Sequence, residues 1–413
     1  MNGAREDLLA IYASALAAVD GTRVVARHLA AHPLAGEWLG VAIGKAAAAM
    51  WAGARQVLGE RLAGGLVITR EGHAEQLANQ PGLEVIEADH PVPGPRSLAA
   101  GRRLLAFLDA APADARFLFL ISGGTSSLVE VLPESLDASQ LARLNTWLLG
   151  SGLDIGAVNA VRRRCSCIKG GGLLYWIGDR QVACLLISDV PNDDPAVIGS
   201  GLLVPGGAGA LPEGLPDWIR EGLMPAAPGR EQASADCRIV ADRRLALDAA
   251  AAAASARGHR VHRHAEFLAG EAQATGERLA EALLHGPAGV HLWSGETTVR
   301  LPERPGRGGR NQHLALAAAR RLAGHDGVYL LTAGTDGSDG PTADAGALVD
   351  GRSVQRMMLD GLDPGQALRA ANAGPCLEAA GDLIRTGPTG TNVMDLVIGL
   401  KLASQSMGYG IRP

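Results

Sequence analysis

Acidic side chains crowd the stretch from Leu330 to Gly351, which reads LLTAGTDGSDGPTADAGALVDG. An apolar run there is typical of a buried strand, and glycines and a proline then prevent a regular element from continuing. Carboxylates on such a loop repel one another, and Mg²⁺ shared with a phosphate would balance their charge. The alternative is a solvated Asp/Gly turn. The carboxylates are those of Asp336, Asp339, Asp344 and Asp350.

A second acidic cluster follows another predicted strand, residues 182–187, where the chain reads Ser188-Asp189-Val-Pro-Asn-Asp193-Asp194. Carboxylate oxygens at the end of a strand are suited to a hard cation. We therefore predict metal binding by the carboxylates of both clusters, namely Asp189, Asp193, Asp336 and Asp339.

Lys45 lies in a Gly-Lys turn between a predicted strand over residues 38–43 and an Ala-rich helix that ends near residue 58. Such a turn is at the carboxyl edge of a sheet, where open α/β sheets bind ligands. It is not a Walker A loop, because Leu39 stands where the first glycine is required and Ala46 replaces Ser or Thr. Lys45 is our first candidate catalytic residue.

Two loops rich in glycine and hydroxyl groups offer free hydrogen-bond donors. Residues 122–127 read SGGTSS after a predicted strand, and residues 386–392 read TGPTGTN before one. Backbone N–H and hydroxyl groups of this kind are typical of a phosphate or carboxylate cradle. The candidate binding residues on these loops are Ser122, Gly123, Gly124, Ser126, Thr386, Thr389, Thr391 and Asn392.

Further cations precede or follow glycine runs. Lys169 stands before three glycines at the end of a cationic stretch, which is either a solvated helix face or an anion site. Arg310 ends the loop RPGRGGR and introduces a predicted helix over 311–322, so its guanidinium is placed to bind an anion bidentately. Arg310 is our second candidate catalytic residue, and Lys169, Glu296 and Asn311 are further candidates for substrate or phosphate binding.

Length and alternating strand and helix patterns predict an α/β fold with two domains. Residues 200–235 are rich in proline and glycine without periodicity, which marks a connection. We place the domains at residues 1–230 and 231–413. The candidate loops come from both halves, so we expect the site in a cleft between the domains.

Composition excludes several classes of protein. The net charge is −5 and no basic cluster is interleaved with aromatic residues, which argues against nucleic-acid binding. Three charged residues, at positions 5–7, stand directly ahead of Leu8, so we expect no signal peptide. No stretch of 18 apolar residues is free of charge, so we expect no membrane span. The five cysteines lack CxxC spacing and are expected to be reduced, in a cytoplasmic protein.

Phosphoryl transfer requires cations on the phosphates, a metal held by carboxylates, and an aligned acceptor. The candidate residues supply each of these, so their chemistry points to phosphoryl transfer, with other enzymes that bind anionic ligands as an equal alternative at this stage.

Nine blocks in collinear order resemble the type 2 glycerate kinases, whose C-terminal half is called the MOFRL domain. The resemblance implies an N-terminal Rossmann-like αβα domain, a second α/β domain and an active site between them. It also implies Mg²⁺-dependent transfer of phosphate from ATP to D-glycerate, giving 2-phosphoglycerate, by a monomer or homodimer in which Lys45 and Arg310 are the key residues. The blocks are GKAAAAM (44–50), EADHPVPG (87–94), LISGGTSSL (120–128), NAVRRRCSCIKGG (159–171), ISDVPNDDPAVIGSG (187–201), SGETTV (294–299), GRGGRNQ (306–312), AGTDGSDGPTADAGALVDG (333–351) and TGPTGTN (386–392).

The sequence departs from the family pattern at positions that bear on the acceptor. Arg164 and Cys165 stand where the family has a histidine block, Leu202 interrupts its S-G-P-T-V-P-D block, Asp242 falls in its G-S-N block, and His313 replaces a glutamate. A kinase for another small hydroxy acid and a silent paralogue that binds a sugar acid or nucleotide are therefore alternatives. Many members of the family carry the older label hydroxypyruvate reductase. A dehydrogenase that acts on hydroxypyruvate would need a GxGxxG turn after a strand, and the sequence contains none.

Overall fold

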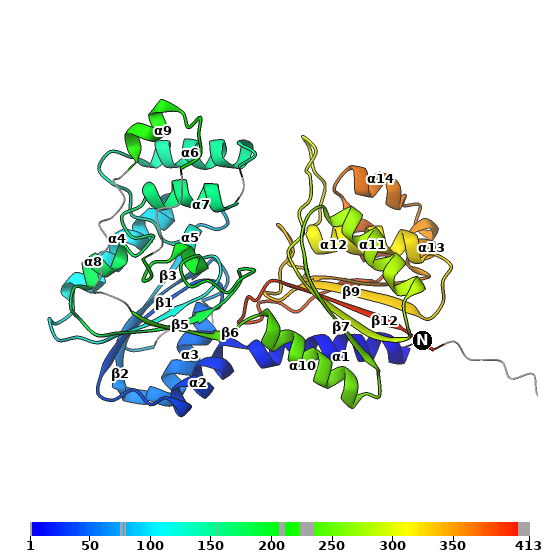
Figure 1. The fold of residues 1–413 in the computed structure, drawn as a ribbon, viewed down its shortest axis with the longest axis horizontal. Coiled ribbons are helices and arrows are strands. Elements are labelled where there is room, and N and C mark those ends of the chain that lie inside the picture. The colour runs from blue at the N-terminus through cyan, green and yellow to red at the C-terminus, as the bar shows by residue number, and fades with distance from the viewer. Residues whose placement is uncertain are drawn as a thin grey trace, which may run out of the picture. The chain divides into compact units, whose positions relative to one another are not determined.

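A computed structural model describes residues 2–74, 77, 80–153, 155–205, 211–223 and 235–403. The chain forms two compact units, each with its own sheet and covering helices (Figure 1). The N-terminal unit comprises Val19–Asp242 and Gly390–Val393. The C-terminal unit comprises Met1–Ala18, Arg243–Thr389 and Met394–Pro413. The predicted α/β fold class is confirmed.

The N-terminal unit is built on a six-stranded parallel sheet in the order β3-β2-β1-β4-β5-β6. This is the strand order of doubly wound, Rossmann-type sheets. It reverses between β1 and β4, so the loops after these strands meet at the switch point, where open α/β sheets bind ligands. The strands are β1 (Trp38–Ile43), β2 (Leu62–Arg70), β3 (Leu83–Ala88), β4 (Phe117–Ile121), β5 (Val182–Ile187) and β6 (Asp236–Ala241).

Helices cover both faces of this sheet, with α2 and α3 on one face and α4, α5 and α8 on the other (Figure 1). Every residue of β4, FLFLI, is buried between the layers. Helices α6, α7 and α9 pack around a smaller core of their own. The helices of this unit are α2 (Gly21–Ala31), α3 (Ala47–Leu58), α4 (Pro95–Ala110), α5 (Thr125–Leu128), α6 (Ala138–Gly150), α7 (Ile155–Arg164), α8 (Leu173–Ile177) and α9 (Asp217–Gly222).

The sheet of the C-terminal unit has the order β11-β10-β9-β12-β8-β7 and is antiparallel except for the β7–β8 pair. Asp395, the first residue of β12, pairs with the last residue of β8, Gly295, and the last residue of β9, Gly334. The segments after β8, after β9 and before β12 therefore meet at one edge. The strands are β7 (Val261–Leu268), β8 (Gly289–Gly295), β9 (Val328–Gly334), β10 (Gly346–Asp350), β11 (Leu383–Ile384) and β12 (Asp395–Lys401).

In the C-terminal unit, α11 to α14 lie on one face of the sheet, and α1 and α10 lie on the other (Figure 1). Among the described residues of the whole chain, no single helix is long and apolar enough to cross a membrane, and α1 and α2 satisfy that test only when taken together. The helices are α1 (Asn2–Val19), α10 (Arg243–Ala256), α11 (Ala272–His285), α12 (Arg310–Leu322), α13 (Ser353–Leu359), α14 (Pro364–Arg369) and α15 (Ala373–Ala379).

The domain prediction differs from the structure at both ends of the first domain. Helix α1 belongs through Ala18 to the C-terminal unit, where the Tyr12 hydroxyl donates to the carbonyl oxygen of Gly334 over 2.7 Å. Strand β6 completes the first sheet, so the units change after Asp242, and the predicted boundary at residue 230 lies outside the described residues. Asp20 separates α1 from α2, and its side chain caps α2 by accepting the backbone N–H of Arg23.

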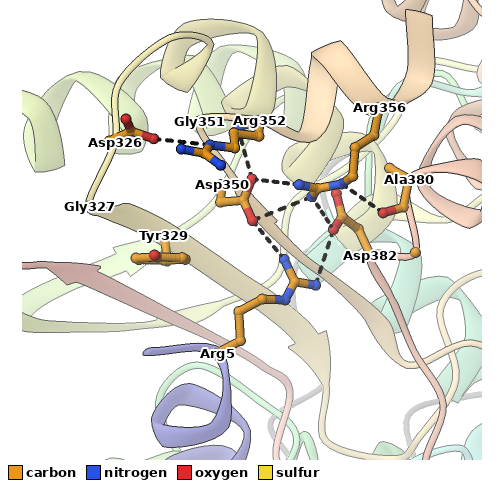
Figure 2. Close-up of a pocket in the computed structure, with 11 residues that line it drawn as sticks. Arg5, Asp326, Gly327, Tyr329, Asp350, Gly351, Arg352, Arg356, Ala380 and Asp382 are labelled. Carbon is orange, nitrogen blue, oxygen red and sulfur yellow. Dashed lines mark hydrogen bonds and ion pairs between the residues drawn. The ribbon is translucent and has the colours of Figure 1, made fainter. Parts of the chain in front are cut away.

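An ion-pair network fastens α1 to the C-terminal sheet (Figure 2). Arg5 reaches Asp350 over 3.0 Å and the buried Asp382 over 3.1 Å, and Arg356 contacts the same two carboxylates. These groups line a cavity of about 320 Å³ whose charges are paired with one another. These ion pairs hold α1 against the sheet. They also neutralise the charge of the Asp350 carboxylate without a metal ion.

Replacement of Arg5 by Ala is expected to lower the free energy of unfolding of the C-terminal unit by about 1–2 kcal/mol, because nearly buried Asp382 loses one of its two cations. Arg352→Ala is the control, since its guanidinium pairs only with the exposed carboxylate of Asp326, and should change stability by about 0.5 kcal/mol or less. Urea denaturation of both variants measures the difference, and equal losses would contradict the anchoring role.

Candidate active site

The loops after β1 and β4 lie against each other at the switch point of the N-terminal sheet. The backbone N–H of Lys45 donates to the carbonyl oxygen of Gly123 over 2.9 Å, and that of Ala46 donates to the Ser122 hydroxyl over 3.0 Å. The Thr125 hydroxyl donates to the carbonyl oxygen of Ile43 over 3.0 Å. Two loops that are 77 residues apart in the sequence are thus held in a fixed relation, with Lys45 on one and the Ser/Gly cradle on the other.

Gly123 permits two polar side chains to approach this loop. A methyl group placed on its Cα would lie 2.0 Å from Nδ2 of Asn392 and 2.0 Å from Oδ2 of Asp189. The Asn392 amide donates to that Asp189 oxygen over 3.1 Å. A side chain at position 123 would push both groups away, so glycine is required for Asp189 and Asn392 to lie over the loop.

Gly124 is similarly surrounded by the side chains of Lys45 and His90. A methyl group on Gly124 would lie 3.2 Å from Cγ of Lys45 and 3.2 Å from the His90 ring. The structure therefore brings together Lys45, the Ser122–Gly124 segment, Asp189 and Asn392, which we predicted separately, and adds His90 to them.

Lys169, a predicted phosphate-binding residue, lies in a buried ion pair. Its ammonium group pairs with Glu130, which also accepts a hydrogen bond from the Ser166 hydroxyl over 2.5 Å. The pair lines a small cavity of about 100 Å³, together with Ser126 and Cys165.

The other carboxylates after β5 are held by local hydrogen bonds. Asp193 has a positive φ of 54° and accepts a hydrogen bond from the Ser188 hydroxyl over 2.7 Å. Asp194 accepts from the backbone N–H of Ala196 over 2.9 Å in an exposed turn. Of the three acidic residues in this cluster, Asp189 is the one that lies against the Ser/Gly loop.

Arg310 begins helix α12 at the edge of the C-terminal sheet and is held by two carboxylates. Its Nε donates to Oδ2 of Asp395 over 2.6 Å, and its Nη2 donates to Oδ1 of Asp395 over 2.9 Å and to Oε1 of Glu296 over 2.6 Å. Burial opposes its charge, but the charge and hydrogen bonds of Asp395 outweigh burial and raise the pKa of Arg310. The guanidinium is fully charged, oriented by a bidentate pair, and still partly open to solvent at 36%.

Asp339 is committed to the start of α12. Its carboxylate accepts the backbone N–H groups of Asn311 over 2.9 Å and of Gln312 over 2.8 Å, and it is only 2% exposed. The Asn311 amide oxygen in turn accepts from the Thr332 hydroxyl over 2.5 Å. Through these contacts Asp339 and Asn311 hold the start of the helix that carries Arg310.

Asp336 lies beside Asp395 at the end of β9. A methyl group on Gly334 would be 3.4 Å from an oxygen of each carboxylate. The loop before β12 is close to the same turn, since a methyl group on Gly337 would be 2.8 Å from the Thr386 hydroxyl. The hydroxyl of Thr389 donates to the Thr335 carbonyl oxygen over 2.5 Å, and the buried Thr391 hydroxyl has no partner among the described residues.

Asp395 is the residue that sequence reasoning missed. The sequence pattern places Asp395 within the strand predicted after the Thr/Gly loop. Only the register of β12, which places Asp395 between the ends of β8 and β9, brings it to Arg310. A useful signal was present, however, because Asp395 is the only charged residue between the Thr/Gly loop and Lys401.

The carboxylates fit Mg²⁺ only in the mode that shares the ion with phosphate. Within the described ranges no three groups among His, Cys, Asp and Glu converge as a metal site. Mg²⁺ usually keeps several waters and is held by one or two carboxylates plus substrate phosphates. Asp189 and Asp336 are each a single carboxylate of the kind that can share Mg²⁺ with a phosphate.

The fold and these loops define a two-unit α/β enzyme of the phosphotransferase class. Residues 7–209 match a family described as a domain of unknown function, DUF4147, and residues 289–395 match the MOFRL family. The chain belongs to the glycerate kinases that have a C-terminal MOFRL domain, as its relatives show.

Among those relatives, a D-glycerate 2-kinase of Thermotoga maritima is 35% identical over 378 residues, which is 87% of this chain and 89% of the relative. A putative hydroxypyruvate reductase of Agrobacterium vitis is 36% identical over 86% of this chain and 97% of its own length. The crystal structure of a glycerate kinase from Thermotoga maritima superposes with a TM-score of 0.84 at 32% identity, covering 97% of this chain and 100% of the other.

The ionisation of Asp339 should appear in the pH dependence of stability. Burial, which outweighs its backbone hydrogen bonds, raises the pKa of Asp339 from 3.8 to about 6. The folded protein therefore binds this proton more tightly than the unfolded chain, and ionisation between pH 4 and 6 lowers stability. Asp339→Asn removes that loss, so the variant should gain on the order of 2–3 kcal/mol relative to wild type between pH 4 and 7.

Chemical denaturation of wild type and Asp339→Asn across this range measures the gain separately from any constant effect on the helix start. Asp363→Asn is the control of opposite sign, because backbone hydrogen bonds lower the pKa of Asp363 at the start of α14. That variant should lose stability relative to wild type as pH rises. A pH-independent difference for Asp339→Asn would contradict the assignment.

Proposed function

We propose that this chain is an ATP- and Mg²⁺-dependent kinase that phosphorylates D-glycerate to 2-phosphoglycerate. The observation that carries the proposal is the convergence of Lys45, Asp189 and Asn392 on the Ser122–Gly124 loop at the switch point of a Rossmann-type sheet. A cation, a carboxylate and several N–H donors are the groups that phosphoryl transfer requires. The family membership supports the same reaction.

In this reaction the acceptor hydroxyl attacks the γ-phosphorus of ATP, and the bond from that phosphorus to the ADP oxygen breaks. Negative charge spreads over the phosphoryl oxygens, so preorganised cations lower the barrier most. Lys45 and Arg310 are the cations we assign to this task, and Asp395 and Glu296 hold the Arg310 guanidinium in one orientation. A fixed guanidinium need not reorganise when charge develops.

Asp189 and Asp336 are the residues that we propose contact Mg²⁺, since each lies beside a candidate phosphate loop. The bound ion would supply charge neutralisation on the phosphate oxygens. We assign the hydroxyl and amide donors of Ser122, Ser126, Thr386 and Asn392 to the substrates, and we propose a cytoplasmic location.

One observation favours a different acceptor. Cys165, which stands in the block where the family has histidine, lines the cavity of about 100 Å³ beside Ser126 and Pro91. If that cavity receives the acceptor, its changed lining would alter which hydroxy acid binds. Leu202, another departure, is packed in the core of the N-terminal unit and has no comparable position.

The proposal is tested by incubating the purified chain with ATP, Mg²⁺ and a panel of small hydroxy acids, and identifying products by ³¹P NMR and mass spectrometry. D-Glycerate should give 2-phosphoglycerate and ADP, with no product when Mg²⁺ is chelated. Phosphorylation of another acid in its place would support the alternative acceptor. NAD(P)H-linked reduction of hydroxypyruvate without ADP release would overturn the kinase, and ATP binding without turnover on any acid would identify a silent binder.

A further inference from the structure

A cavity of about 380 Å³ opens beside Arg310 in the C-terminal unit. Its volume falls within the range of about 300–1,000 Å³ that small-molecule sites occupy. It is far larger than a three-carbon acid needs. We name it the α12 pocket and define it by its lining residues Val299, Leu301, Pro305, Arg310, His313 and Pro341, with small residues between them.

The lining of the α12 pocket is mainly apolar. Leu301, a large aliphatic side chain in this lining, is 64% exposed. Prolines and alanines complete the wall. Such a surface favours a ligand part that is itself apolar, because burying it removes carbon surface from water.

His313 is one of four polar residues in the lining, with Thr297, Thr298 and Arg310. It follows Arg310 by one turn of α12 and lines the pocket, and it is 95% buried, being only 5% exposed. In the described part of the chain its ring makes no hydrogen bond, although a buried imidazole normally finds a partner. Burial lowers the pKa of His313, which keeps the ring neutral at physiological pH. One neutral ring nitrogen in an apolar pocket is suited to hydrogen-bond a neutral heteroaromatic group.

The charge of the pocket rules out a small acid as its main occupant. Arg310 is the one cation in its lining; its Nε and Nη2 bind Asp395 and Glu296, which leaves its Nη1 group to bind the charged part of a ligand. An additional carboxylate buried among the prolines and Leu301 would have no cation of its own. A molecule with an apolar, hydrogen-bonding ring at one end and phosphates at the other matches both ends of the pocket.

We infer that the α12 pocket binds the purine base of the nucleotide substrate, with the base between Leu301 and His313 and the phosphates directed toward Arg310. The inference rests on the proposed kinase function and names the place where its nucleotide binds. His313, one of the departures from the family pattern, is then a residue that determines affinity for the base.

Binding measurements separate the base from the phosphates. Isothermal titration of the full chain with ATP, and separately with inorganic triphosphate, both with Mg²⁺, needs no turnover. Leu301→Ala and His313→Leu should each weaken ATP binding by on the order of tenfold, since each removes a contact made only with the base. Triphosphate binding should stay within about twofold, because it depends on the charged end of the site.

Leu359→Ala is the matched control, since Leu359 is also exposed but does not line the α12 pocket. It should leave both affinities unchanged, and thermal melting confirms that each variant is folded. If the variants bind ATP as wild type does, or lose ATP and triphosphate equally, the inference is overturned while wild-type kinase activity stands. If wild type binds no ATP and forms no ADP, the proposed function fails together with it.

Discussion

The bidentate pair between Arg310 and Asp395 is the interaction on which the C-terminal half of the candidate site depends. Asp395 is almost buried, and Asp336 lies beside it. Without the guanidinium, two carboxylates would face each other in a setting that disfavours their charge. The pair also fixes the plane of the guanidinium, so that its remaining donors point in a defined direction. The Arg310–Asp395 pair thus contributes to the stability of the C-terminal unit and also orients the guanidinium for the proposed chemistry.

Backbone geometry makes that pair possible. The antiparallel register of β12 brings its first residue between the ends of β8 and β9, and the N–H groups at the start of α12 are satisfied by Asp339. In the N-terminal unit a different geometry has the same effect, because strand order reverses between β1 and β4 and gathers their loops. In each unit the sheet assembles the site from segments that are distant in the sequence.

Much of this arrangement could be predicted from the sequence. The strand before Lys45 and the strand before Ser122 have local signals, and the structure confirms both. Side-chain partners could not be predicted, because they depend on contacts between segments. The sequence around Lys169 does not show that Glu130 pairs with it, and the sequence around Asp339 does not show that two N–H groups of α12 donate to it. Asp395 had no local signal strong enough to single it out.

Our central proposal is that Lys45 and Arg310 both stabilise phosphoryl transfer, and single-turnover kinetics of Lys45→Met, Arg310→Lys and the double variant test it most directly. Arg310→Lys keeps a cation beside Asp395, so folding should be preserved while the planar fork is lost. We expect each single variant to slow phosphoryl transfer by about a hundredfold, and the double variant to be slowed by much less than the product of the two. Single variants within a few-fold of wild type, or effects that multiply, would contradict the account.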